Sequence, residues 1–109
     1  MTFRFRLLQE YEETYQTEEA LVFSDTASPG LVPLWESIGV YESLYNSDGK
    51  QAREISKALA YGLDRLNNEV FISENLPVIH LDKVKEAIRF LENVLRACTV
   101  HSYARIETS

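Results

Sequence analysis

Hydrophobic and polar residues alternate at both ends of the chain and recur with helical spacing between them. The first predicted strand covers residues 2–8, where Phe3, Phe5 and Leu7 alternate with arginines. Residues 100–106 alternate in the same way and predict a closing strand. The best-marked helix begins near Leu81 or Asp82. Its apolar face comprises Val84, Ala87, Ile88, Leu91, Val94, Leu95 and Cys98.

Two further helical segments are expected between these strands. In the first, Pro33 stands where a helix can begin, and Gly39 predicts a break into two short helices. In the second, Asp48 is the expected N-cap and Gln51 its capping-box partner. The apolar stripe of this second helix comprises Ala52, Ile55, Leu59, Leu63 and Leu66.

The segment between the first strand and Pro33 is less clearly marked. Residues 9–19 are polar and acidic, with Tyr11 and Tyr15 one helical turn apart, so a short helix is expected there. Residues 20–23 either close that helix or form a short strand, because four residues do not establish a period. Residues 24–30 have the composition of a loop.

Together these elements predict an α+β fold, with three or more amphipathic helices packed on a small sheet that includes the N- and C-terminal strands. Residues 70–72 are expected to add a short strand, after which Pro77 interrupts any helix into the last segment. The length of 109 residues fits a single globular domain over residues 1–109. A purely helical bundle with frayed ends is the alternative.

Composition places the chain among ordinary globular proteins, with 45% hydrophobic and 26% charged residues. The longest apolar stretch, residues 58–63, falls far short of the roughly 20 residues that a membrane span needs. Cys98 is the only cysteine, so no internal disulfide can form, which fits a reducing cytoplasm. We therefore expect a cytoplasmic protein that does not enter a membrane.

Charge is distributed unevenly along the chain. From Leu7 to Gly49 there is no Lys or Arg but there are nine acidic residues, whereas residues 50–109 hold nine bases and eight acids. The formal net charge of −6 argues against direct nucleic-acid binding, which needs clustered Lys and Arg. The excess of negative charge belongs to one continuous part of the sequence.

That acidic part also carries four of the six tyrosines, which offer large rigid contact areas with a polar tip. Carboxylates around such anchors attract a basic partner. We therefore predict a non-enzymatic module that binds a basic protein, immunity- or inhibitor-like in charge and size, without a cofactor or a metal. The predicted contact residues are Tyr11, Glu12, Tyr15, Glu18, Glu19, Glu36, Tyr41, Glu42, Tyr45 and Asp48. The ordinary explanation is a solvated acidic face with the tyrosines in the core.

The sequence also allows two alternative interpretations. A small enzyme or ligand-binding domain would use His80, Asp82, Cys98 and His101. A structural zinc site normally has four ligands, whereas this chain offers only three His or Cys candidates, and Cys98 is better explained as a small buried hydrophobe. The second alternative is a homo-oligomer, for example a homodimer, in which terminal strands pair between chains.

Overall fold

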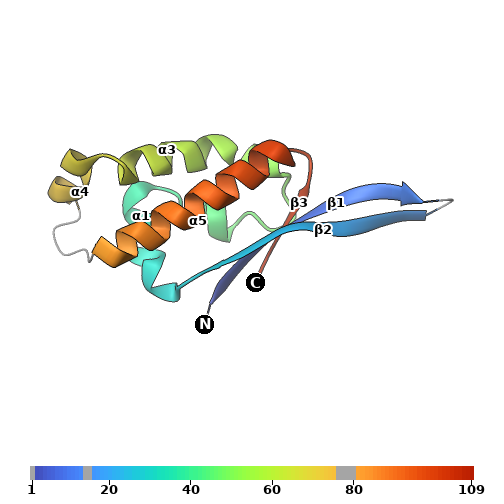
Figure 1. Ribbon diagram of the computed structural model, residues 1–109, viewed down its shortest axis with the longest axis horizontal. Helices are drawn as coiled ribbons and strands as arrows, with labels where there is room; N and C mark the ends of the chain where they lie inside the picture. Colours follow the sequence, from blue (N-terminus) through green and yellow to red (C-terminus); the bar gives the residue numbers. More distant parts are fainter. Residues whose placement is uncertain (1, 14–15, 76–80) are drawn as a thin grey trace.

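The computed structural model describes residues 2–13, 16–75 and 81–109, and over these residues it shows one antiparallel sheet with helices grouped on one side of it (Figure 1). The strands are β1 (Phe3–Glu13), β2 (Gln16–Ala27) and β3 (Arg105–Thr108), in the order β2–β1–β3. The helices are α1 (Val32–Ile38), α2 (Tyr41–Tyr45), α3 (Ser56–Leu66), α4 (Glu69–Asn75) and α5 (Leu81–Val100). Single 3-10 turns cover Pro29–Leu31 and Ala52–Glu54. The predicted α+β fold, with both terminal strands in the sheet, is confirmed.

β1 and β2 form one long hairpin. Its register runs from Phe3 opposite Ala27 to Glu13 opposite Gln16. The helix expected over residues 9–19 is therefore wrong, because the described part of this segment belongs to two paired strands. The hairpin projects along the long axis of a molecule that measures 56 × 26 × 19 Å (Figure 1).

The sequence pattern fails in this segment because the distal half of the hairpin leaves the core. Phe3, Phe5 and Leu7 of the first predicted strand are buried, whereas residues 9–11 and 16–21 are half-buried or exposed. Strands that are exposed on both faces lack the apolar alternation that marks a half-buried strand. Residues 20–23 adopt the strand alternative, and β2 continues through the first half of the expected loop, as far as Ala27.

The sheet is short on the side of β3. β3 pairs with β1 only from Phe5 to Leu8. Its outer edge is covered by the loop between α2 and the 3-10 turn at Ala52–Glu54, where the Gly49 N–H donates to the Ile106 carbonyl at 2.8 Å. The Ile106 N–H in turn donates to the Lys50 carbonyl, also at 2.8 Å. The distal half of β1 therefore extends past the end of its neighbour.

The core lies between the sheet and the helices. Its largest fully buried side chains are Trp35, Phe5, Phe90, Leu7, Leu31, Ile38, Leu44, Leu59, Leu91, Ile106, Val40 and Val94. Asp25 ties β2 to α5, because its carboxylate accepts hydrogen bonds from Arg89 Nη1 at 3.1 Å and from Asn93 Nδ2 at 3.4 Å. The core thus joins residues from the sheet and from the helices.

The predicted break at Gly39 is confirmed. Gly39 ends α1 with φ +80°, a left-handed conformation that favours glycine. Arg65 of α3 binds this corner, with Nη1 donating to the Ile38 carbonyl at 2.6 Å. Gly62 allows α3 to approach the same corner closely, since a Cβ there would lie 2.2 Å from Val40 Cγ1.

The start of the second predicted helix needs one correction. The capping box is formed by Gln51 and Glu54 rather than by Asp48 and Gln51, and it belongs to a 3-10 turn that precedes α3. Asp48 instead accepts a hydrogen bond from the Thr108 N–H at 2.9 Å. Of the predicted stripe, Leu63 is half-buried and the other four residues are buried.

The strand expected over residues 70–72 is also wrong, because this segment lies in α4. The side chain of Asn68 accepts a hydrogen bond from the Phe71 N–H at 3.1 Å, which is the bond of a helix N-cap. This cap starts a new helical segment immediately after α3. Pro77, which was expected to interrupt it, lies outside the described residues.

α5 agrees with the best-marked predicted helix. Ile88 and Leu95 of its predicted face are half-buried, and the other members are buried. Phe90 and Ala97 are buried as well, although the predicted face did not include them. The closing strand begins later than expected, at Arg105, because the helix continues to Val100 and a turn follows over residues 101–103.

Candidate functional site: an acidic hairpin arm

The residues predicted to bind a partner fall into separate groups in the fold. Tyr11, Glu12, Glu18 and Glu19 lie on the distal hairpin, whereas Glu36, Tyr41, Glu42 and Tyr45 lie on α1 and α2. Asp48 stands apart, bonded to β3, and Tyr15 lies outside the described residues. Glu12 is described by its backbone position alone. The structure thus does not gather these residues on one continuous surface.

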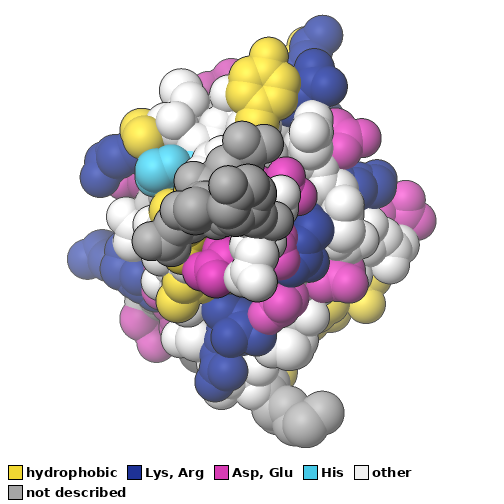
Figure 2. Space-filling view, turned by 90° about the vertical axis from the view of Figure 1, so that its right-hand side faces the viewer, with side chains coloured by type: hydrophobic (Ala, Val, Ile, Leu, Met, Phe, Trp, Pro, Cys, Tyr) yellow, Lys and Arg dark blue, Asp and Glu magenta, His cyan; other side chains and the backbone are white. Residues whose placement is uncertain are grey.

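We call residues 9–13 of β1 and 16–21 of β2 the arm. The arm has five Glu residues and no Lys or Arg. It forms one end of the long axis, and the helices gather toward the other end (Figure 1). Seen end-on, several Asp and Glu side chains lie beside the end of the hairpin, while Lys and Arg side chains are visible elsewhere in the same view (Figure 2). Acidic charge is therefore concentrated on the arm and does not cover the whole of this end.

Cross-strand pairs on the arm bring acidic residues together. Glu10 lies directly opposite Glu19, and Tyr11 lies directly opposite Glu18. The Tyr11 hydroxyl donates a hydrogen bond to Glu18 Oε2 at 2.8 Å. This bond to the carboxylate raises the pKa of Tyr11, because the phenol must stay protonated to donate. The Tyr11 side chain is 42% exposed, and its bond to Glu18 holds the ring at the surface.

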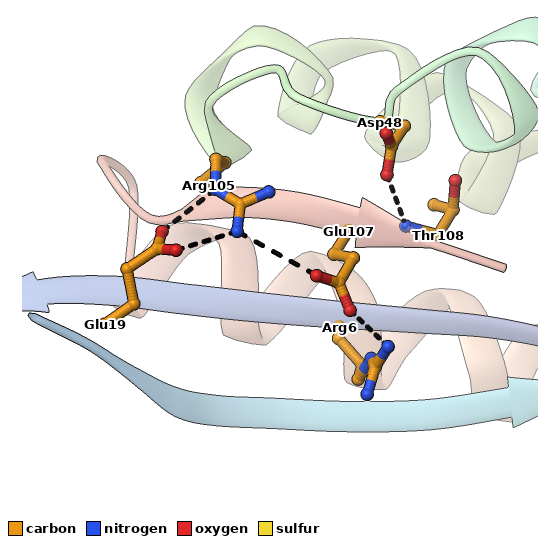
Figure 3. Close-up of polar contacts among 6 residues, drawn as sticks. All are labelled: Arg6, Glu19, Asp48, Arg105, Glu107 and Thr108. Atoms are coloured by element: carbon orange, nitrogen blue, oxygen red, sulfur yellow. Dashed lines mark hydrogen bonds and ion pairs between the residues drawn. The ribbon is translucent and has the colours of Figure 1, made fainter.

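Arg105 neutralises one acid at the base of the arm. Its Nε and Nη2 donate to the two carboxylate oxygens of Glu19, each at 2.9 Å (Figure 3). These hydrogen bonds lower the pKa of Glu19. On the same outer face of the sheet, Glu107 lies 3.9 Å from Arg105 and forms an ion pair with Arg6 (Figure 3).

Two arm carboxylates lack such a partner. Within the part of the chain that the structure describes, Glu10 and Glu18 form no ion pair with Lys or Arg. Glu10 and Arg105 were both missed as candidate site residues. Glu10 is one of the nine acids in the base-free stretch, but its position opposite Glu19 becomes visible only when the hairpin register is known.

The helical group is organised differently, around a stack of three aromatic rings. The Tyr45 ring lies 4.2 Å from that of Phe3 and 4.6 Å from that of Tyr41, measured between centroids. Burial, and to a lesser degree the neighbouring Tyr41, raises the pKa of Tyr45. Glu36 and Glu42 are exposed beside Tyr41 and line a shallow depression with it. Both tyrosines are half-buried and pack on the core.

The alternative catalytic group does not assemble among the described residues. Cys98 is fully buried, and burial raises the pKa of its thiol to about 12. Asp82 lies in the first turn of α5, so it is separated from Cys98 by 16 helical residues, or about 24 Å. His101 is half-buried in the turn after α5, and His80 lies outside the described residues. In the described chain no group of three His, Cys, Asp or Glu side chains could hold a metal ion.

A small groove near the base of the arm was not anticipated. It lies between β2 and the C-terminal part of α5, and Val22, Phe23, Ala97, Val100 and His101 are among the residues that line it. The hairpin register shifts by one residue next to Val22. No sequence signal marks this shift, so the groove could not have been predicted.

Comparison with known proteins does not add a functional assignment. No protein-family model matches the chain, and searches of curated proteins and of solved structures find no match. Within the described ranges, no helix combines the length and the hydropathy needed to cross a bilayer. The function is therefore argued from the arm itself.

Proposed function

We propose that this chain is a non-enzymatic protein-binding module that uses its arm to engage a basic protein, in the charge-based manner of immunity or inhibitor proteins. The observation that carries the proposal is the position of Glu10 opposite Glu19 on an exposed hairpin. Like charges directly opposite each other in a sheet are destabilising. A cationic partner would relieve this repulsion, because Arg105 pairs with Glu19 and Glu107 but not with Glu10.

The exposed ring of Tyr11 supports the same function. It lies between the acidic residues and offers apolar area that a partner can cover. A tyrosine surrounded by carboxylates suits a surface that carries Lys and Arg around an apolar contact. The arm would repel nucleic-acid phosphates, so we propose a protein rather than DNA or RNA as the partner.

We also propose that the protein works in a reducing compartment such as the cytoplasm. Its only cysteine is a buried free thiol, so the fold gains nothing from an oxidising environment. Intracellular basic proteins, including nuclease-type enzymes and DNA-binding proteins, are the partner class that this location makes available.

The test is affinity capture from an extract of the source cells at two salt concentrations, followed by mass spectrometry. The bait is the wild-type chain or the triple variant E10Q/E12Q/E18Q, which removes three arm carboxylates. The control bait, E69Q/E74Q/E92Q, removes three acids from α4 and α5 and leaves the arm intact. We expect a basic protein that the wild type and the control retain, that the arm variant loses, and that high salt releases, because exposed charges are screened. Equal retention by the two triple variants would contradict the proposal.

A further inference from the structure

β1 continues past the end of β3 and leaves one side of the arm without a neighbouring strand. β3 pairs with β1 as far as Leu8, which lies opposite Arg105. The next five residues of β1, Gln9 to Glu13, pair only with β2 on their other side. Along the described chain, no strand or loop hydrogen-bonds to the open side of this segment. This edge, residues 9–13, is the open β1 edge.

The backbone direction of β1 shows which groups face this edge. Arg4 exchanges both of its backbone hydrogen bonds with Ser109, at 2.9 and 3.1 Å, so its N–H and C=O point toward β3. In an antiparallel sheet, alternate residues direct these groups to the same side. The backbone N–H and C=O groups of Arg6 and Leu8 therefore point toward β3, and those of Glu10 and Glu12 point into the open β1 edge.

Other edges of the sheet are protected where they pass the helices. The outer side of β3 is bonded to the backbone of residues 49–50. On β2, the Thr26 N–H is bonded to its neighbour Asp25 at 2.8 Å, and the same carboxylate is bonded to Arg89 of α5. An unprotected edge strand is a template for another strand. The open β1 edge is unprotected in this way, and both residues whose backbone groups face it, Glu10 and Glu12, are acidic.

We infer that the open β1 edge accepts an extended basic segment of the partner protein as an added strand in line with β3, an inference that rests on the proposed function. Strand addition supplies main-chain hydrogen bonds for affinity, and alternate side chains supply specificity. The segment would carry Lys or Arg at every second position, on the face of the sheet that bears Glu10. The residues between them would be apolar and would lie on the face of Tyr11.

Arg105 shows how such a cation would sit. It lies on the strand next to β1, opposite Leu8, and reaches across β1 to Glu19 on the far strand. A Lys or Arg two residues further along the line of β3 would lie opposite Glu10. The partner strand would thereby extend the row of charges that Arg6, Glu107, Arg105 and Glu19 begin (Figure 3).

A second copy of this chain is a poorer occupant of the same edge. Pairing two arms along their open β1 edges would bring Glu10 and Glu12 of one copy beside the same acids of the other. Neighbouring carboxylates repel each other at neutral pH. The charge of the arm therefore selects a basic strand over another arm, and self-association is an outcome that the test must detect.

The experiment uses the full chain and a synthetic ten-residue peptide that alternates lysine with valine. Two methylated forms carry N-methyl groups either on all lysine amides or on all valine amides, so each form loses hydrogen-bonding capacity along one edge of the extended peptide. Binding is measured by fluorescence anisotropy at low ionic strength. We expect one methylated form to bind about tenfold more weakly than the parent and the other to bind as the parent does, because only one edge contacts β1.

Amide hydrogen exchange locates the contact. Bound parent peptide should slow exchange at Glu10 and Glu12 but not at Thr17 and Glu19 on the opposite edge of the arm. Equal binding by the parent and both methylated peptides, or equal weakening by both methylations, would overturn strand addition, and arm-dependent capture of a basic protein would still stand. Failure of the parent peptide to bind would overturn it too. So would a peptide-free dimer in light scattering whose Glu10 and Glu12 amides are protected.

Discussion

Glu10 and Glu19 lie directly opposite each other in the hairpin, yet within the described chain only Glu19 has a cationic partner, Arg105. The bidentate bond fixes one side of the base of the arm and leaves the other side acidic. We therefore expect stability to depend on Glu19 and the proposed binding to depend on Glu10. The two residues can be tested separately.

Replacing Arg105 by Gln should raise the pKa of Glu19 toward the ordinary range of a glutamate. A carboxyl whose folded pKa is lowered stabilises the fold above its unfolded pKa, and this contribution is lost as the pH falls through the folded pKa. R105Q should therefore unfold at lower urea concentration than the wild type at pH 7, and the difference should shrink at about pH 3. Carboxyl NMR titration measures the pKa, and R4Q is the control because Arg4 forms no ion pair in the described chain. An unchanged Glu19 pKa in R105Q would contradict this account.

Replacing Glu10 by Lys should stabilise the hairpin and weaken partner binding. The new cation would lie opposite Glu19 and replace repulsion by attraction. E12K is the matched control, since it makes the same charge change on the same strand but lies opposite the neutral Thr17. Thermal unfolding should show a higher midpoint for E10K than for E12K, while both bind the basic partner less tightly. A midpoint for E10K at or below that of E12K would show that the cross-strand repulsion is negligible.

The elements that the sequence predicts well are those with one buried face. The apolar stripe of α5 and the alternation from Phe3 to Leu7 both arise because one face of the element packs on the core. Both patterns predicted the correct type of element. Residues 9–19 show no such apolar pattern, because polar residues occur at both odd and even positions of this segment. The spacing of Tyr11 and Tyr15 matches a helical turn, but Tyr11 lies in a strand.

Tertiary pairing explains the remaining differences. Two pairs of residues near the start of α3 have the three-residue spacing of a capping box. They are Asp48 with Gln51 and Gln51 with Glu54. The backbone at Gly49 and Lys50 is bonded to Ile106 of β3, so it cannot enter a helix, and the second pair forms the capping box. The opposition of Glu10 and Glu19 likewise depends on a hairpin register that no local pattern reveals.

Replacing Gly62 by Ala tests the contact between α3 and the corner after α1. The added Cβ would lie 2.2 Å from Val40 Cγ1, so the corner would have to move. Overpacking should outweigh the higher helix propensity of alanine and lower the free energy of unfolding by about 1–2 kcal/mol. Urea denaturation measures the loss. In the V40A background, where the clashing methyl is absent, the same substitution should be neutral or stabilising, and equal losses in both backgrounds would place the strain elsewhere.

Replacing Cys98 by Ala should remove part of the instability of the protein at alkaline pH. Burial raises the pKa of the thiol from 9.0 to about 12, so the unfolded chain loses this proton before the folded chain does. The thiol therefore stabilises the folded state below pH 9, and this contribution to the free energy of unfolding is lost as the pH rises toward 12.

C98A should be about 1 kcal/mol less stable than the wild type at pH 7, because a buried atom is removed. Its free energy of unfolding should then fall less steeply above pH 9, with the same tyrosines titrating in both proteins. Parallel curves for the two proteins would show that the thiol does not titrate differently on folding, and rapid reaction of Cys98 with a thiol reagent in the native state would show that it is accessible.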